Sequence, residues 1–241
     1  MFDHGCVAAS SLATALADLP ITRASALSVG ARTQPLTSGS EVETRYHRTL
    51  DGLSGLLGPG LRRGSSYLVE GSTSLCLALA AGASQAGSWC AAVGMPQLGV
   101  QAAAGLGVDL ERFAVVPDPG NHWLEVAATL ADAVDIILLK PPSRARDGDV
   151  RRLAARLRQR GSTLVVQASG WSGLEARLTV TNSQWLGAAD DGRGYLSARH
   201  AQVTVSGKGA PVTERLWLPG PDGGVRPFAE QSAAPALRAV R

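Results

Sequence analysis

Uninterrupted apolar runs and periodic apolar stretches alternate through the centre of the chain. Runs of about four apolar residues bounded by turn or charged residues are typical of strands that are buried on both faces of a parallel sheet. Stretches in which apolar residues recur every three or four positions are typical of helices that cover such a sheet. The predicted strands are residues 67–70, 89–93, 113–116, 136–139 and 163–166, and the predicted helices are residues 75–81, 97–105, 121–133 and 149–160.

The pattern changes after residue 174. Residues 177–181, 195–205 and 212–218 alternate apolar and polar side chains, and glycine-rich turns such as residues 190–194 separate them. This alternation is typical of antiparallel strands. The sequence therefore predicts an α/β fold, in which a mainly parallel sheet is flanked by helices and carries an antiparallel β extension at its C-terminal end.

The two ends of the chain lack this regularity. In the N-terminal part, residues 1–48, only residues 6–19 have the apolar spacing of a short helix, and a polar arm follows. Residues 49–219 are the predicted core domain. Residues 220–241 begin with turn residues and are expected to form a flexible tail, with one short helix at residues 235–240.

The composition points to a cellular compartment but does not identify a binding partner. The chain of 241 residues is 45% hydrophobic, and no apolar run approaches the roughly 20 residues that a membrane span needs. Asp3 stands where a secretory signal would carry positive charge. Because Cys6, Cys76 and Cys90 are odd in number and widely spaced, we expect buried thiols and a cytoplasmic protein. A net charge of only +3 is weak evidence for nucleic-acid binding.

Several short motifs resemble the core of the RecA-like superfamily. The segment Gly64-Ser-Ser-Tyr-Leu-Val-Glu-Gly71 looks like the strand that leads into a phosphate-binding loop, and Leu50-Asp-Gly-Leu53 looks like part of the segment before it. The likeness continues at Gly107-Val-Asp-Leu-Glu-Arg-Phe113 and at Val134-Asp-Ile-Ile-Leu-Leu139. It covers about residues 50–218 and implies a RecA-like sheet.

Within that superfamily the chain is most similar to the small ImuA proteins in their actinobacterial form. The short length, the altered loop and the Arg-rich, Ala-rich composition agree with this resemblance. Proteins of this family are accessories of DNA repair by damage-induced (SOS) mutagenesis, and they act with a Y-family-like polymerase subunit and an error-prone replicative polymerase. The resemblance therefore implies protein-protein interaction in a nucleoid-associated translesion-synthesis complex, DNA contact through that complex, and room for self-association.

The groups that would hydrolyse a nucleotide are missing from the positions that the resemblance assigns to them. A phosphate-binding loop needs G-x-x-x-x-G-K-[ST], whereas no second glycine and no lysine follow Gly71. Lys140 stands where a carboxylate should hold Mg²⁺, and residues 94–97 lack the catalytic glutamate. We therefore expect a pseudo-ATPase with no catalytic residue, metal or cofactor, and no group near Gly71 that neutralises a triphosphate.

A weaker anion site remains open at the same position. The start of the helix after Gly71 offers N–H groups and the hydroxyls of Ser72, Thr73 and Ser74, and Lys140 can add charge from a neighbouring strand. The alternative is that Ser72 or Thr73 only caps the helix. No metal-ligand spacing occurs among the four histidines, so none is assigned to a metal.

Arginines on one predicted helix provide another candidate surface. Arg151, Arg152, Arg156 and Arg158 lie opposite the apolar stripe of the helix that ends at residue 160. They can meet a phosphate backbone or an acidic partner, or simply form a solvated face.

Two short loops offer a candidate contact with single-stranded DNA. Loops that hold DNA in RecA proteins correspond here to residues 143–148 and 169–173, which can bring Arg144 to a phosphate and Trp171 to a base. Both are too short to wrap a strand.

Three functions remain open on these observations. The first is a non-catalytic scaffold in a translesion complex. The second is a divergent ATPase that uses Lys140 or an arginine of another subunit, and the third is a DNA-repair protein that binds single-stranded DNA. Mg²⁺-dependent ATP turnover would favour the second, and a steep salt dependence of DNA affinity would favour the third.

Overall fold

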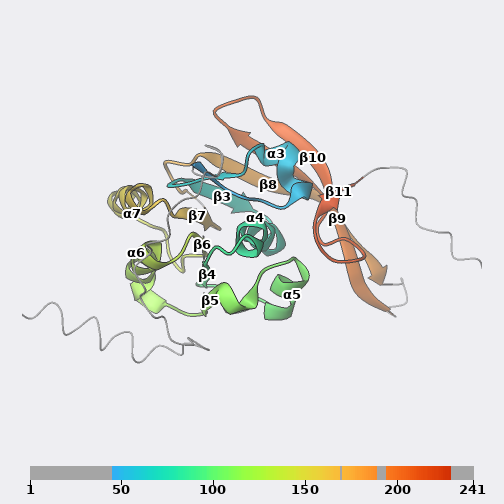
Figure 1. The fold of residues 1–241 in the computed structure, drawn as a ribbon, viewed down its shortest axis with the longest axis horizontal. Helices are drawn as coiled ribbons and strands as arrows, with labels where there is room; N and C mark the ends of the chain where they lie inside the picture. The colour runs from blue at the N-terminus through green and yellow to red at the C-terminus, as the bar shows by residue number, and fades with distance from the viewer. Residues whose placement is uncertain (1–44, 169, 189–193, 229–241) are drawn as a thin grey trace, which may run out of the picture.

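A computed structural model describes residues 45–168, 170–188 and 194–228 of the chain. This part contains a nine-stranded mixed sheet with helices on both faces, and a small two-stranded ribbon (Figure 1). The two predicted terminal helices, at residues 6–19 and 235–240, lie outside the described residues.

The spatial order of the sheet is β11-β10-β9-β8-β3-β7-β6-β4-β5. In chain order the strands are β3 (Ser66–Glu70), β4 (Cys90–Val93), β5 (Phe113–Val116), β6 (Ile136–Leu139), β7 (Thr163–Val166), β8 (Ala176–Ala188), β9 (Gly194–Gly207), β10 (Val212–Trp217) and β11 (Arg226–Pro227). Neighbouring strands from β8 to β5 are parallel, and those from β8 to β11 are antiparallel. The predicted mainly parallel sheet with an antiparallel extension is therefore confirmed.

Helices connect consecutive parallel strands of the chain from β3 to β7, as crossover connections require, whereas η1 and α3 precede β3. Their bounds are η1 (Asp51–Leu53), α3 (Ser54–Leu57), α4 (Thr73–Gln85), α5 (Val100–Gly105), η2 (Leu110–Arg112), η3 (Gly120–His122), α6 (Trp123–Ala133) and α7 (Asp147–Arg160). The ribbon consists of β1 (Tyr46–His47) and β2 (Leu61–Arg62). Each predicted helix of the core is present, and α4 extends beyond its predicted bounds at both ends.

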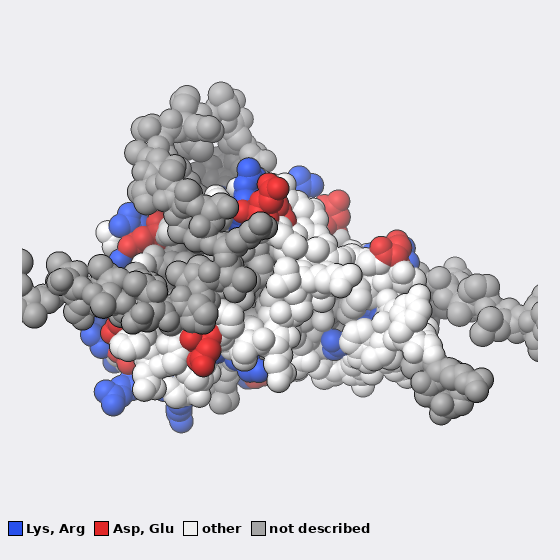
Figure 2. Space-filling model, turned by 90° about the horizontal axis from the view of Figure 1, so that it is seen from below, with Lys and Arg blue, Asp and Glu red and all other residues white. Residues whose placement is uncertain are grey.

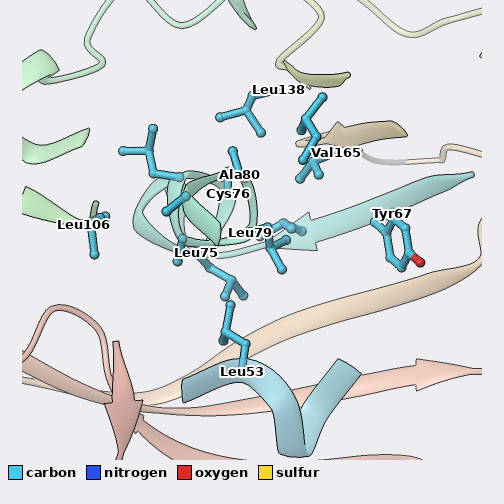
Figure 3. Close-up of a cluster of buried hydrophobic side chains, with 14 of the residues drawn as sticks. Leu53, Tyr67, Leu75, Cys76, Leu79, Ala80, Leu106, Leu138 and Val165 are labelled. Carbon is cyan, nitrogen blue, oxygen red and sulfur yellow. The ribbon is translucent and has the colours of Figure 1, made fainter. Parts of the chain in front are cut away.

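Each face of the sheet has its own apolar core, because successive side chains of a strand point to opposite faces. On one face, Tyr67, Leu138 and Val165 pack around α4 together with Leu53 of η1 (Figure 3). On the other face, α6 and α7 lie side by side (Figure 1). Their apolar stripes cover alternate strand residues, namely Leu68, Ala91, Val93, Ile137, Leu139, Leu164 and Val166.

One strand joins the sheet in a different direction from the prediction. We expected residues 177–181 to begin the antiparallel extension, but β8 pairs in parallel with β3, from Tyr67–Ala176 to Glu70–Thr179. The reason is the connection formed by residues 167–175, which leads from the end of β7 to the start of β8. Trp171 in this connection is buried in the core beneath α6 and α7, so a loop performs a crossover that a helix performs elsewhere.

The ordered core is wider than residues 49–219. Residues 46–47 pair with β2 at one end. At the other end, β11 pairs with β10, and Phe228 stacks on His200 with ring centroids 4.5 Å apart. The prediction of a flexible tail was therefore wrong for residues 220–228, because this segment folds back and places β11 and Phe228 against the sheet. In the described part of the chain, no helix is both long and apolar enough to cross a membrane.

The arginine-rich helix α7 begins earlier than predicted. We expected Asp149 to cap it, but the helix starts at Asp147, and the capping position is Arg146, which makes no side-chain cap bond. Both aspartates lie in the first turn, where their charge is favourable toward the helix dipole. Gly161 ends the helix in the left-handed conformation (φ 73°), as its sequence position suggested.

The two described cysteines provide a test of the core. Cys76 and Cys90 are buried, and burial raises the pKa of both thiols, that of Cys90 to about 12. At pH 8 a thiol of that pKa is ionised in about one molecule in ten thousand. In a Cys6→Ser variant, we expect no labelling of the native protein by a thiol reagent at pH 8 and labelling of two thiols after unfolding in urea. Rapid labelling of the native variant would contradict the described packing.

Candidate functional site

Two hollows lie at the edge of the sheet where the parallel strands end. One, of about 390 Å³, is lined by residues after β3 and β7, and the other, of about 740 Å³, lies among residues after β4, β5 and β6. Thr73 and Lys140 line both. Five prolines line the larger cleft, at positions 96, 117, 119, 141 and 142. Because ligands of open α/β sheets bind outside the carboxyl ends of the strands, this edge is the candidate functional site.

The junction between β3 and α4 is a tight turn closed by the chain's own hydroxyl groups. Gly71 has φ +83°, and a Cβ on it would lie 3.2 Å from the carbonyl oxygen of Val180. Ser72 is buried, and its Oγ accepts a hydrogen bond from the backbone N–H of Leu75 at 3.2 Å. Ser72 is therefore the residue that caps the helix, one of the two that the sequence offered. Thr73 is exposed and donates to Gln167 at 3.4 Å.

A guanidinium from the antiparallel extension reaches this junction. Arg199 of β9 is only 8% exposed, and its Nη1 donates to Ser72 Oγ at 3.2 Å. Its Nε donates to Ser183, and its Cζ lies 5.6 Å from the ring centroid of Trp185. Burial lowers the pKa of this guanidinium, which nonetheless remains charged at neutral pH. No carboxylate forms an ion pair with it in the part of the chain that the structure describes.

Arg199 places a cation beside the β3–α4 junction that the sequence motifs did not indicate. The motif search missed it because it follows Ser72 by 127 positions in the sequence. One signal was present in the pattern. Arg199 lies two and four positions before Ala201 and Val203, so its side chain points to the same buried face of β9. A charged side chain on a buried face needs a partner inside the protein.

The carboxylate next to the junction is held by the neighbouring strand. Glu70 ends β3, and its Oε1 accepts from Arg177 Nη1 at 2.7 Å while Oε2 accepts from Thr179 Oγ1 at 3.2 Å. Both partners belong to β8, so this pair ties the strand ends together. Glu70 lines the smaller hollow together with Lys140.

The positions from which the hydrolytic groups are missing come together at the larger cleft. Lys140 follows β6 and is exposed, and residues 94–97 follow β4. The two strand ends touch closely, because a Cβ on Gly94 (φ +73°) would lie 2.1 Å from the carbonyl oxygen of Lys140. Within residues 45–168, 170–188 and 194–228, no cluster of three or more metal-ligating side chains occurs.

The two predicted DNA-contacting loops lie side by side, but only one candidate side chain is available. Arg144 is exposed, and a Cβ on Gly170 would lie 3.6 Å from its guanidinium. Trp171 is 6% exposed and packs on Trp123, with ring centroids 6.4 Å apart. The expectation that Trp171 stacks on a base was therefore wrong, because its ring completes the core under the crossover loop.

The four candidate arginines of α7 lie on its exposed face, as predicted, but two of them are paired. Arg152 pairs with Asp149. Arg156 contacts both carboxylate oxygens of Asp132 on α6. Positive and negative side chains are accordingly mixed on the left-hand side of Figure 2.

Two arginines of α7 remain available to a phosphate or an acidic surface. Arg151 donates to the backbone carbonyl of Asp147 at 3.3 Å. Neither Arg151 nor Arg158 pairs with a carboxylate in the described residues. Together with Arg144 they form a sparse basic surface rather than a continuous one.

Comparisons with known proteins agree with the fold and leave the site without an assigned role. Residues 55–173 match the family model described as the MT3502 N-terminal domain. The chain is 40% identical over 121 residues to "Uncharacterized protein Rv3395c" of Mycobacterium tuberculosis (strain ATCC 25618 / H37Rv), a match that covers 48% of this chain and 58% of that protein. The chain thus spans less than two thirds of the length of this relative.

A solved structure establishes the fold class. The chain is similar to the RadB recombinase, with a TM-score of 0.53 and 14% identity over 74% of this chain and 97% of that chain. At this level of identity the likeness shows the fold alone. The RecA-like fold that the sequence motifs implied is confirmed.

The Ser72 junction yields a stability prediction. Ser72→Ala removes the helix cap and the Arg199 acceptor, so we expect the free energy of unfolding to fall by about 1–3 kcal/mol. Ser72→Asp keeps the cap and adds a carboxylate beside Arg199, so it should be more stable than Ser72→Ala. Thr73→Ala, at an exposed position, is the control and should change the value by less than about 0.5 kcal/mol. Urea denaturation measures all three, and equal stability of Ser72→Ala and wild type would contradict this role.

The Arg156–Asp132 contact yields a pH prediction. Hydrogen bonding to Arg156 lowers the pKa of Asp132 in the folded protein. A depressed carboxyl pKa stabilises the fold above the unfolded pKa, and this contribution disappears as the pH falls through the folded value. Arg156→Ala should therefore be less stable than wild type at pH 7, with a difference that shrinks in acid. Arg158→Ala is the control, and urea denaturation across a pH series would count against the contact if both variants showed the same pH-independent difference.

Proposed function

We propose that this protein is a non-catalytic RecA-like accessory protein of damage-induced (SOS) mutagenesis that binds a Y-family-like polymerase subunit in a translesion-synthesis complex. The observation that carries the proposal is the β3–α4 junction. There Ser72 caps the helix, and Arg199 of the same chain contacts the same hydroxyl. This junction holds a strand and a helix together instead of presenting a glycine-rich, lysine-bearing loop to a phosphate chain.

Two further features support the absence of hydrolysis. Lys140 occupies the strand end at which RecA-like enzymes hold Mg²⁺, and a cation there repels the metal. One carboxylate beside the junction, Glu70, is engaged by Arg177 and Thr179. Replacing one missing group would leave the others missing, so we propose that the fold serves as a scaffold.

The partner in this proposal comes from the ImuA resemblance. The complex would include the Y-family-like subunit and an error-prone replicative polymerase, act in the cytoplasm at the nucleoid, and contact DNA mainly through the other subunits. Residues 6–19 and 235–240 are the proposed contact segments on this chain, because both have apolar spacing suited to docking as short helices.

A second candidate, nucleotide binding by a divergent ATPase, is favoured by one observation. Two cations, Lys140 and the buried Arg199, stand near the start of α4. The positive charge of either side chain would offset the negative charge of a phosphate bound at the N-terminus of α4. The third candidate, direct binding of single-stranded DNA, retains Arg144 but loses Trp171.

The test measures partner binding and ATP turnover on the purified full chain. We expect a stable complex with the Y-family-like subunit in size-exclusion chromatography, and no Mg²⁺-dependent ATP turnover with or without single-stranded DNA. Deleting residues 1–44 or 229–241 should weaken the complex at least tenfold, about 1.4 kcal/mol, while the midpoint of the cooperative urea unfolding of the core stays unchanged. Thr129→Ala, at an exposed position of α6, is the control and should bind normally.

Turnover that is lost in both Lys140→Ala and Arg199→Gln would favour the enzyme instead. Full binding by both deletion variants would show that the contact segments are misplaced. Failure of the intact chain to bind the subunit would contradict the proposed function itself.

A further inference from the structure

The larger of the two hollows, here termed the proline-lined cleft, has an apolar floor and rigid walls. Leu77 of α4 and Met95 after β4 are buried members of the apolar core, and Leu98 and Ala102 continue this apolar lining. Five prolines complete the walls. Because the ring of proline fixes φ, such walls lose little freedom when a ligand binds. With a volume of about 740 Å³, the cleft has the size of a ligand pocket.

The backbone of the proline-lined cleft offers few donors to a ligand. Proline has no N–H group, and the N–H groups of three other lining residues are already bonded inside the protein. These are Gly94, Leu98 and Lys140, whose acceptors are backbone carbonyl oxygens at 2.9 to 3.1 Å. A phosphate group is held by several N–H donors at once, so the cleft is poorly suited to one and recognises polar groups mainly through side chains.

Among the described residues that line the cleft, Lys140 is the only cation and Asp118 is the only carboxylate. Lys140 is exposed and forms no ion pair within the described part of the chain. Thr73, at the start of α4, lines the cleft beside it, so the positive end of the helix dipole adds to the charge of the lysine. Asp118 accepts a hydrogen bond from the backbone N–H of Gly120 at 3.1 Å. A ligand with one negative charge toward Lys140 therefore suits the cleft, whereas a second negative charge toward Asp118 is repelled.

The proline-lined cleft adjoins the smaller hollow, because Thr73 and Lys140 line both. Glu70 in the smaller hollow is neutralised by Arg177, so Lys140 carries the available charge at the boundary between the two. Both hollows are open to solvent along the carboxyl edge of the sheet. A small molecule binds best in a pocket that encloses it, whereas a peptide lies along an open groove and places its side chains in successive hollows. The shape of this site favours a peptide.

We propose that the proline-lined cleft binds a short peptide segment of a partner protein, in which a large apolar side chain enters the cleft and a neighbouring acidic side chain pairs with Lys140. The apolar side chain packs on Leu77, Met95 and Leu98 and leaves water as it does so. The acidic side chain fixes the direction of the peptide, because Lys140 and Asp118 have opposite charges. The inference goes beyond the proposed polymerase complex, since it holds for whichever protein supplies the segment.

Selection of random dodecapeptides displayed on phage, with the full chain as bait, tests the class of ligand. We expect the selected peptides to share a large apolar residue next to Asp or Glu. Lys140→Glu reverses the charge of the lining, so the peptides that it selects should carry Lys or Arg at the acidic position. Lys208→Glu is the control, because it reverses the other lysine of the chain at an exposed position that lines a different hollow, and it should select the same peptides as wild type.

Obstruction of the cleft tests its location. A fluorescein-labelled peptide with the selected pattern is titrated with the full chain, and fluorescence anisotropy reports binding. Ala102→Arg places a long side chain in the lining from an exposed position of α5, so it should weaken binding by about tenfold or more. Ala104→Arg is the matched control, because Ala104 is exposed on the same helix but does not line the cleft, and it should bind as wild type does. The urea unfolding midpoint of both variants should equal that of wild type.

The proposal fails if no shared pattern emerges from the selection, or if the acidic position persists in peptides selected by Lys140→Glu. It also fails if Ala102→Arg and Ala104→Arg bind the peptide equally, because the peptide site then lies elsewhere. Binding of ATP that Ala102→Arg blocks, in a chain that selects no peptide, would assign the cleft to a nucleotide instead. These outcomes are distinct from those of the polymerase test, which concerns the terminal segments of the chain.

Discussion

The central strands of this protein are buried on both faces, and this constraint governs the remaining architecture. The strands β3, β7, β6 and β4 contribute only four or five residues each, nearly all of them buried. Strands of that kind need cover on both sides, which α4 and α5 give on one face and α6 and α7 on the other. Because all four strands run in the same direction, their carboxyl ends lie at the same edge of the sheet.

At that edge the side chains of the protein make a set of internal contacts. Ser72 uses its hydroxyl to cap α4, Glu70 is tied to β8, and Arg199 approaches from β9. These contacts link the parallel half of the sheet to its antiparallel extension. The junction therefore contributes to cohesion between the two halves, which is consistent with a scaffold that presents surfaces to partners.

The antiparallel extension also creates surface that a parallel core alone lacks. Its two longest strands, β8 and β9, are anchored at the base by pairing with β3 and β10 and at mid-length by Arg199. The part beyond these anchors has apolar side chains that no other layer of the described residues covers. Helix α7 lies over the parallel strands, on the face of the sheet that α6 also covers. Ion pairs with Asp132 and Asp149 balance part of the charge of its arginine-rich face.

Local sequence was sufficient for the order and type of the core elements, the RecA-like fold class and the exposed arginines of α7, because periodicity depends on near neighbours. It offered Ser72 and Thr73 equally as the cap of α4, and the structure shows Ser72 in that role. Tertiary structure decided what depends on residues far apart in the sequence. Sequence patterns gave the wrong expectation for the direction of β8 relative to β3, for Trp171, which packs on Trp123, and for residues 220–228, which contact the sheet. Arg199 at the α4 junction is the clearest case, because a contact across 127 positions exists only after the extension has folded against the core.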